Sequence, residues 1–434
     1  MPIIIKNGSL LLGKSLRFVN NGFIEIGKNG IITNVGRRNY NAGHDNKDKT
    51  YELIDAEGFM ILPGFINAHT HIGDSIGKDI AVESGLDKRV HPVLGVKRNI
   101  LHKSKPDHLK TFMRNSALSM MKRGIIAFAD FREDGIVGIR LLKEALSGLP
   151  IKCIILGRVE YYLKPKDEST GGVLLGGKKK TRKRTNTRLP SYVLKMLSTI
   201  LKASDGIGLS GANENTDESL LQYRELLRGE RSSENKKKKL LLAIHAAESE
   251  DTVQFSKLLT GRTEVSRIMQ YLRPDILVHM TNPTDEDISI VRNSNVGIVL
   301  CPRANGILGS GIPRVSRMIK TRCIIGLGTD NVMLNSPDMF KEMDYLWKVS
   351  RATETRFITA TEILKMSTVY PAQILNLNSG TIDIGKSADL LFIDKHHIDL
   401  YPMHDPHASI VQRAGQETIR AVMIDGEFVS GDGI

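Results

Sequence analysis

Cysteine is scarce in this chain, which has three cysteines in 434 residues and no Cys-x-x-Cys pair. Because Cys153, Cys301 and Cys323 lie far apart, the sequence excludes a small disulfide-stapled domain and a zinc site built from paired thiolates. Apolar runs are also short, and none reaches the roughly 18 residues that span a bilayer. The first residues, MPIIIKNGSLLLG, have no basic stretch leading into a long apolar segment, so they do not resemble a signal peptide. We therefore expect a cytoplasmic protein with reduced thiols and no membrane partner.

Acidic residues are outnumbered, and the formal net charge is +13. Most of this charge is concentrated in two polar segments: residues 164–188 hold nine Lys and Arg against two acidic residues, and residues 228–239 hold six against two. No RNP-like, helix-turn-helix or zinc-finger motif accompanies them. Charge concentrated in this way favours solvated surface loops, and a nucleic-acid-associated protein acting through these basic loops stays as an alternative.

Apolar residues make up 41% of the chain, which is enough for the core of one large domain and a smaller module. Short β-type runs, broken by Asn-Gly and Gly turns, occupy the start of the chain, and the end of the chain has the same character. We expect residues 1–62 and 376–434 to combine into one small β-sandwich domain.

Between the termini, over residues 63–375, short apolar runs rich in β-branched residues alternate with helix-like stretches such as 106–121 and 250–259. Alternating β and α units with nearly continuous apolar strands indicate a parallel sheet. Eight such units favour a (β/α)8 barrel of the TIM type over an open sheet. The eight runs are FMILPGFINAHTH, GIIAFADF, IKCIILGRVE, GIGLSG, LLLAIHAAE, DILVHM, VGIVLCP and CIIGLGTD.

Histidines and acidic residues stand at the ends of four of these runs. They are His69 and His71 after the first run, His245 and Glu248 after the fifth, His279 after the sixth and Asp330 after the eighth. Side chains alternate along an extended segment, so both imidazoles of the His-x-His pair point to the same side. Functional residues of such a barrel gather at the C-terminal ends of the strands. Nitrogen ligands with a carboxylate suit Zn²⁺ or Fe²⁺ with one position left for water.

Each of these residues also has a structural interpretation when it is taken alone. A His-x-His pair arises by chance, and a single histidine such as His279 in an apolar strand is commonly a hydrogen-bonded core residue. Asp330 could cap a following helix. The joint placement at matched strand ends favours the metal-site interpretation.

These residues carry a resemblance to a known family. ILPGFINAHTH resembles the signature of the amidohydrolase superfamily. The order of His-x-His, His with Glu three positions later, a further His and then Asp is similar to its aminohydrolase branch, which includes cytosine, guanine and S-adenosylhomocysteine deaminases and triazine chlorohydrolases. CPRANGILGSGIP, GLGTDNVMLNSPDMFKEM and IGKSADLLFID resemble the same branch, so the resemblance runs almost from end to end. It implies a (β/α)8 barrel beside a β-sandwich built from both termini.

The resemblance also implies a ligand set and catalytic roles. It implies one divalent metal, zinc first and iron as the alternative, held by His69, His71, His245 and Asp330. Glu248 would be the proton shuttle, and His279 would orient water or substrate beside the metal. With or without the resemblance, Asp330 and His279 can accept or steer the proton of a metal-bound water. Two-metal members use a carboxylated lysine at the end of the fourth strand, where this chain reads GIGLSGANE without a lysine. The implied reaction is hydrolytic deamination of a nucleobase, nucleoside or related N-heterocycle by metal-activated water.

The substrate is a small molecule that the sequence specifies poorly. Arg132, Arg158, Arg303 and Asn305 follow strand-like runs and are candidates for substrate contacts, the first two as clamps for a carboxylate or phosphate. Exposed salt-bridging arginines are the alternative interpretation for both. A flat heterocycle needs a stacking partner, and Phe131 and Tyr161 are candidates, because the only tryptophan, Trp347, lies in a helix-like stretch away from the strand ends.

Three alternatives to deamination stay open at this point. The same site could hydrolyse an amide or cyclic amide, or remove chlorine from a triazine-like ring. The barrel could also be a non-catalytic binding module, although the intact ligand set argues against that. A homo-oligomer is compatible with the sequence.

Overall fold

The computed structural model describes residues 1–37, 51–93, 95–162, 188–232 and 239–431. Most of the two basic segments, 164–188 and 228–239, lies outside these residues, so their role stays a prediction. Within the described part of the chain, no helix is long and apolar enough to cross a membrane.

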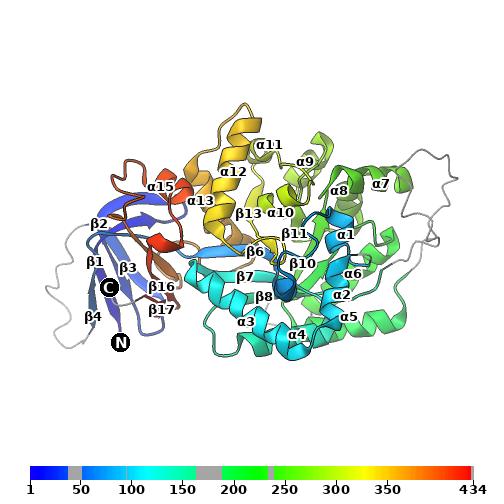
Figure 1. The fold of residues 1–434 in the computed structure, drawn as a ribbon, viewed down its shortest axis with the longest axis horizontal. Coiled ribbons are helices and arrows are strands. Elements are labelled where there is room, and N and C mark those ends of the chain that lie inside the picture. Colours follow the sequence, from blue (N-terminus) through cyan, green and yellow to red (C-terminus); the bar gives the residue numbers. More distant parts are fainter. Residues whose placement is uncertain (38–50, 94, 163–187, 233–238, 432–434) are drawn as a thin grey trace.

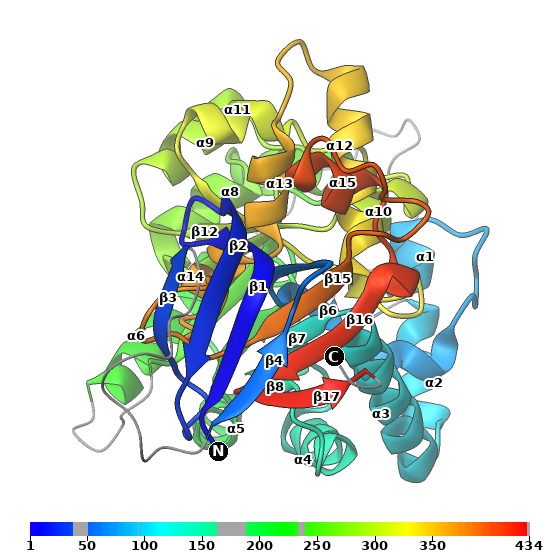
Figure 2. The same ribbon diagram turned by 90° about the vertical axis from the view of Figure 1, so that its left-hand side faces the viewer.

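Strands from both ends of the chain form one eight-stranded sheet in the order β17-β16-β15-β5-β1-β2-β3, with β4 paired to β1. The strands are β1 (Ile3–Leu12), β2 (Arg17–Ile26), β3 (Ile32–Arg37), β4 (Glu52–Asp55), β5 (Phe59–Pro63), β15 (Leu390–Asp394), β16 (Ile419–Ile424) and β17 (Glu427–Ser430). The two halves join where β5 runs antiparallel to β15. Figure 2 shows the N-terminal and C-terminal strands side by side. The termini therefore combine as expected, but what is seen is a single sheet, and the two-sheet sandwich stays a prediction.

Nine parallel strands form the second sheet, in which the first eight follow one another in the order of the chain and the ninth lies beside the first. They are β6 (Phe65–His71), β7 (Ile125–Arg132), β8 (Lys152–Gly157), β9 (Gly206–Leu209), β10 (Leu241–Ala246), β11 (Ile276–His279), β12 (Gly297–Leu300), β13 (Ile324–Leu327) and β14 (Asp330–Asn331). Only two residues separate β13 from β14, and β14 pairs with β6 through Asp330 opposite Thr70. The sheet thus curls from its last strand back to its first, which fits the predicted TIM-like barrel.

The first predicted run is divided between the two sheets. Gly64 separates β5, in the terminal sheet, from β6, in the barrel. A Cβ at Gly64 would lie 2.4 Å from Cγ2 of Ile126, so only glycine lets the chain pass this close to β7. The proposed boundary between residues 62 and 63 falls near this point.

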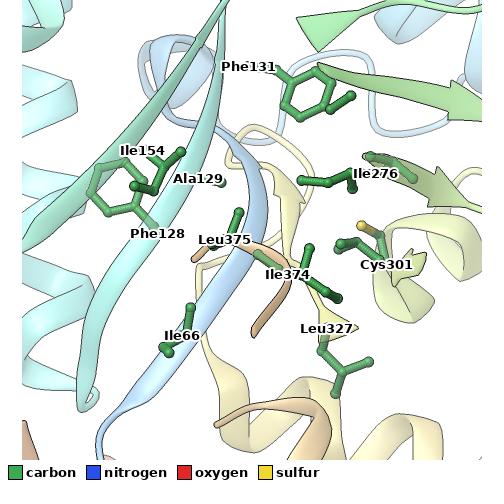
Figure 3. Packing of buried hydrophobic residues seen from close by; sticks show 14 of the residues in the cluster. Ile66, Phe128, Ala129, Phe131, Ile154, Ile276, Cys301, Leu327, Ile374 and Leu375 are labelled. Carbon is green, nitrogen blue, oxygen red and sulfur yellow. The ribbon is translucent and has the colours of Figure 1, made fainter. Parts of the chain in front are cut away.

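The barrel strands are buried on both faces, as expected for a parallel sheet covered by helices. Figure 3 shows buried side chains from several strands, with Ile374 and Leu375 lying among them. Ile374 ends helix α14 (Val369–Ile374) and packs where a Cβ on Gly297 would lie only 2.7 Å from it. Full burial of one such aliphatic side chain stabilises the fold by about 1.5–3 kcal/mol.

Helices alternate with the strands and surround the barrel, and the terminal sheet lies at one end (Figure 1). Besides α14, the α-helices of the described residues are α1 (Leu86–Val90), α2 (Val96–Lys103), α3 (Pro106–Lys122), α4 (Gly135–Leu146), α5 (Ser191–Ala203), α6 (Asp217–Arg231), α7 (Glu250–Thr260), α8 (Glu264–Arg267), α9 (Asp285–Arg292), α10 (Pro302–Ile307), α11 (Val315–Lys320), α12 (Met339–Thr353), α13 (Ala360–Met366) and α15 (Pro406–Gln412). The predicted helices 106–121 and 250–259 match α3 and α7 closely. Between β6 and α3 the chain makes the two short helices α1 and α2, and Lys97 of α2 contacts Glu133 at the end of β7.

Candidate metal centre and active site

Four side chains from three strands converge at one end of the barrel. His69, His71, His245 and Asp330 each offer one ligand atom, and these four atoms all lie within 4.8 Å of one another. Nε2 of His69 is 3.2 Å and Nε2 of His71 is 3.6 Å from Oδ1 of Asp330. These are the four residues that the sequence assigned to a metal, and all four are buried or nearly so.

Two of the three imidazoles, those of His71 and His245, are held in a form that can bind a metal. Nδ1 of His71 donates to Oε1 of Glu133 at 2.8 Å, and Nδ1 of His245 donates to the carbonyl oxygen of Leu209 at 2.8 Å. With Nδ1 as the donor, the Nε2 lone pair remains free for a metal ion. Burial lowers the pKa of His69 to about 4 and that of His71 to about 3, and the pKa of His245 is also well below its usual value. All three rings are therefore neutral at neutral pH, which metal ligation requires.

Asp330 completes the group as an anion. Burial by itself would raise its pKa, but the hydrogen bond from His69 and the neighbouring histidines hold the pKa of Asp330 far below its usual range. Three neutral nitrogen ligands and one carboxylate are a donor set that suits Zn²⁺ or Fe²⁺. The residues present therefore fit a single divalent cation.

Left-handed backbone conformations occur at the strand ends around this group. Ala247, His279 and Asp330 have φ values of 49°, 74° and 58°, although none of them is glycine. Such conformations cost of order 1–3 kcal/mol each and cluster at functional sites. Strand periodicity does not predict such angles.

Glu248 and His279 lie beside the ligand group. Oε2 of Glu248 is 3.6 Å from Nε2 of His279, and both residues form a second close group with Asp330. Burial raises the pKa of Glu248 to about 7, and nearby carboxylates add to the effect. A carboxyl group with this pKa can both give and accept a proton near neutral pH.

Asn305 orients His279. Oδ1 of Asn305 accepts a hydrogen bond from Nδ1 of His279 at 2.9 Å, and its Nδ2 donates to the hydroxyl of Thr281. Asn305 is fully buried by these contacts. The sequence proposed Asn305 as a substrate contact, but its amide is occupied on both sides, which favours a supporting role behind His279.

The three arginines proposed for substrate contacts lie in different surroundings. Arg158 is buried near the ligands: Nε donates to the carbonyl oxygen of Gly208 at 3.4 Å, and its charge adds to the effect of burial in lowering the pKa of His69. Arg132 is buried behind His71, with Nη2 2.9 Å from Oε2 of Glu133. Arg303 donates to Asn335 and to the carbonyl oxygen of Ser336, and pairs with Glu342. Substrate binding by these residues stays a prediction, and only Arg158 has surroundings that favour it.

The two aromatic candidates also differ. The ring of Phe131 packs edge-on against His69, with centroids 4.4 Å apart, and is fully buried. Tyr161 is partly buried and meets Tyr192 at 6.4 Å between centroids. Phe131 therefore packs against the histidine cluster. Stacking of either ring on a substrate stays a prediction.

Sequence reasoning missed the carboxylate and the lysine behind His71. Glu133 is buried at the end of β7 and, besides His71 and Arg132, contacts Nζ of Lys97 at 2.6 Å. Burial by itself would raise the pKa of Glu133, but Lys97, His71 and Arg132 hold it well below its usual range. The strand-end position in FREDG could have suggested Glu133, whereas Lys97 lies in a helix with no sequence signal.

A second group of ligand-type residues lies at the surface. His102, Asp134 and Glu160 offer ligand atoms within 4.8 Å of one another, and the side chain of His102 is 46% exposed. Nε2 of His102 is 3.8 Å from Asp134 and 3.6 Å from Glu160. An exposed histidine beside two surface carboxylates is a common arrangement, so this group does not require a metal.

Comparison with protein families places the chain among known enzymes. Residues 60–429 match the model of the amidohydrolase family. The chain belongs to the amidohydrolase family. This confirms the predicted resemblance, and with it a hydrolase of carbon–nitrogen bonds.

Relatives of this amidohydrolase extend over its whole length. A protein of Methanothermobacter thermautotrophicus, whose name gives the class aminohydrolase and no substrate, is 34% identical over 98% of this chain and 99% of its own length. A 5-methylthioadenosine/S-adenosylhomocysteine deaminase of Thermococcus sibiricus is 28% identical over 99% of this chain and 94% of its own. The crystal structure of an adenosine deaminase from Xanthomonas campestris with bound zinc superimposes with a TM-score of 0.80, 17% identity, and coverage of 98% and 92%.

Proposed function

We propose that this amidohydrolase removes an exocyclic amino group from a nucleoside, a nucleobase or a related N-heterocycle by hydrolysis. The observation that carries the proposal is Glu248, whose carboxyl group has a pKa near 7 and faces His279 beside three neutral histidines and Asp330. Relatives that are named deaminases and match along nearly the whole chain support the choice of reaction.

One divalent cation, zinc or alternatively iron, would be held by His69, His71, His245 and Asp330. When bound, such a cation supplies Lewis-acid chemistry, lowering the pKa of a water molecule from 15.7 toward about 7. The end of β9 is followed by Ser210 and Gly211, with no lysine that could bridge a second metal. We therefore propose a single-metal centre.

The protein's own residues then have distinct tasks. Glu248, poised near neutral pH, would take a proton from the attacking water and deliver it to a ring nitrogen or to the leaving group. His279, with Nδ1 held by Asn305, would present Nε2 to the water or to the substrate. Asp330 stays ionised and balances positive charge at the centre. Positioned proton transfer of this kind contributes about 10²–10⁴-fold to rate.

Substrate recognition is proposed to involve Arg158. It is buried beside the ligand histidines, and its guanidinium group also hydrogen-bonds Tyr162. A guanidinium group in this position suits a carboxylate, phosphate or hydroxyl-rich substituent on the substrate. Arg303 lies on the same side of the barrel, after β12, but is engaged by Glu342, so we assign it a lesser part.

Ammonia release tests the proposal most directly. The zinc-loaded protein would be offered adenine and guanine nucleosides, free nucleobases, cyclic amides and chlorinated triazines, with ammonia, ring opening and chloride measured in parallel. We expect ammonia from at least one aminated heterocycle and no reaction after chelation. Ring opening or chloride release without ammonia would replace deamination by one of the two alternative hydrolyses.

The domain division and the cellular location rest on the sequence alone, and we propose them together with this function. They are the division into residues 1–62 with 376–434 and residues 63–375, and a cytoplasmic location. Binding of RNA through the basic segments is the non-enzymatic alternative. Filter binding across a salt series tests it, because electrostatic binding weakens steeply with salt.

A further inference from the structure

Helix α2 sends one side chain into the barrel end behind the metal ligands. Lys97 is 6% exposed, although lysine is rarely buried without a partner. Its Nζ lies 2.6 Å from Oε1 of Glu133 and 3.5 Å from Oδ2 of Asp74. The same Oε1 of Glu133 accepts the hydrogen bond from Nδ1 of His71 at 2.8 Å. One oxygen atom thus joins the lysine to a candidate metal ligand.

The second contact of Lys97 leads to the other side of the site. Asp74 accepts from Nδ2 of Asn331 at 2.7 Å and from the backbone N–H of Met333 at 3.0 Å. Asn331 is the neighbour of Asp330 in β14. Lys97 therefore links the segment that carries His71 with the segment that carries Asp330.

The buried charges around Lys97 make its removal costly. Removing one partner from a buried ion pair is strongly destabilising, because the remaining charge is left uncompensated. Glu133 also pairs with Arg132, so it keeps one cation if Lys97 leaves. Asp74 has no other cation partner among the ion pairs formed by the described residues, so its position depends more on Lys97.

We propose that Lys97 is a positioning residue of the metal centre, which holds Glu133 against Nδ1 of His71 and so couples the docking of α2 to metal binding. This rests on the proposed function, because it presupposes that His71 binds the metal. Linkage makes the effect reciprocal: if docked α2 favours metal binding, bound metal must favour docked α2 by the same factor. A purely structural ion pair would instead stabilise the metal-free and the metal-loaded protein equally.

The test compares Lys97→Met with a matched control on the same helix. Arg98 is exposed, so Arg98→Met removes the same charge from α2 without touching the network. Zinc affinity would be measured by competition with a chromophoric chelator, and hydrogen exchange of residues 95–103 would be measured with and without zinc. We expect Lys97→Met to weaken zinc binding about 10–100-fold, the range found for residues that support metal ligands. It should also abolish the zinc-dependent protection of α2, while Arg98→Met changes neither.

Two further variants keep the test decisive. Lys97→Arg retains the charge and should recover part of the zinc affinity, and Lys97→Gln, which retains a donor, replaces Lys97→Met if that variant does not fold. Unchanged zinc affinity in the lysine variants, with equal loss of stability in zinc-free and zinc-loaded protein, would overturn the positioning role and leave the metal centre standing. Absence of zinc binding by the unsubstituted protein would overturn the proposed metal centre and, with it, this inference.

Discussion

Nε2 of His279 lies 3.6 Å from Oε2 of Glu248, at the ends of the neighbouring strands β11 and β10. Neither side chain belongs to the group of four candidate ligands, yet both form a close group with Asp330, which does. The pair thus places a carboxyl group and an imidazole beside the position where a metal and its water are expected.

Glu248→Gln should separate proton transfer from metal binding. The substitution keeps the shape of the side chain and removes its proton chemistry, so we expect kcat to fall at least about a hundredfold with zinc content unchanged. Glu250→Gln is the matched control, because Glu250 is exposed at the start of α7 and an acid there interacts mainly with the helix dipole. Near-normal kcat in a fully loaded Glu248→Gln protein would remove the assigned role.

Asn305→Ala should disturb the orientation of the His279 ring without removing a contact to the substrate. The alanine leaves Nδ1 of His279 buried without an acceptor, which costs about 1–3 kcal/mol of stability. Misorientation of the ring should lower kcat about 10–100-fold. Asn305→Asp retains an acceptor and should keep most of the activity. If instead KM rises while kcat is preserved in both variants, Asn305 contacts the substrate, as the sequence suggested.

Metal content should be one equivalent per chain. His245→Ala removes a ligand and should lose zinc and activity together, as should treatment of the native protein with a strong chelator. His102→Ala disrupts the exposed group at the surface and should leave the single equivalent in place. Elemental analysis of the native protein, His245→Ala and His102→Ala measures the zinc content per chain. Two equivalents in active His102→Ala protein would contradict the single-metal centre.

Glu264→Gln should change the dependence of stability on pH. Burial, together with the charge of Glu214, raises the pKa of Glu264 to about 8, while its carboxylate accepts from the backbone N–H of Ala247. Between pH 4.5 and about 8 the folded protein therefore binds a proton that the unfolded chain has lost, so this group's contribution to stability falls as the pH rises through that window.

The glutamine keeps an acceptor for Ala247 and cannot ionise. Its Tm should equal that of the unsubstituted protein below pH 4.5 and exceed it increasingly up to pH 8, by the equivalent of a few kcal/mol in order of magnitude. Thermal melts of both proteins across this range provide the measurement, with Glu250→Gln as an exposed control. A constant difference in Tm at every pH would show that Glu264 is already ionised in the folded protein.

The sequence by itself determined the order of the elements and the identity of the converging ligand-type residues. Apolar runs of strand length, separated by helix-like stretches, are local patterns, so they predicted the parallel barrel and the ends of α3 and α7. The His-x-His pair with His245 and Asp330 could be read in the same way, because residues at the C-terminal ends of barrel strands are brought together by the topology alone.

Only the tertiary structure decided what stands behind those residues. Arg132 ends β7 and Asn305 lies in α10 after β12, both near the strand ends that carry the ligands. Arg132 nevertheless pairs with Glu133 and Asn305 with His279, because a position near a strand end does not by itself fix which group a side chain contacts. The role of Lys97 could not be predicted from the sequence for a different reason. Its partners Glu133 and Asp74 lie on other elements, and a buried ion pair exists only once packing has excluded water around both charges.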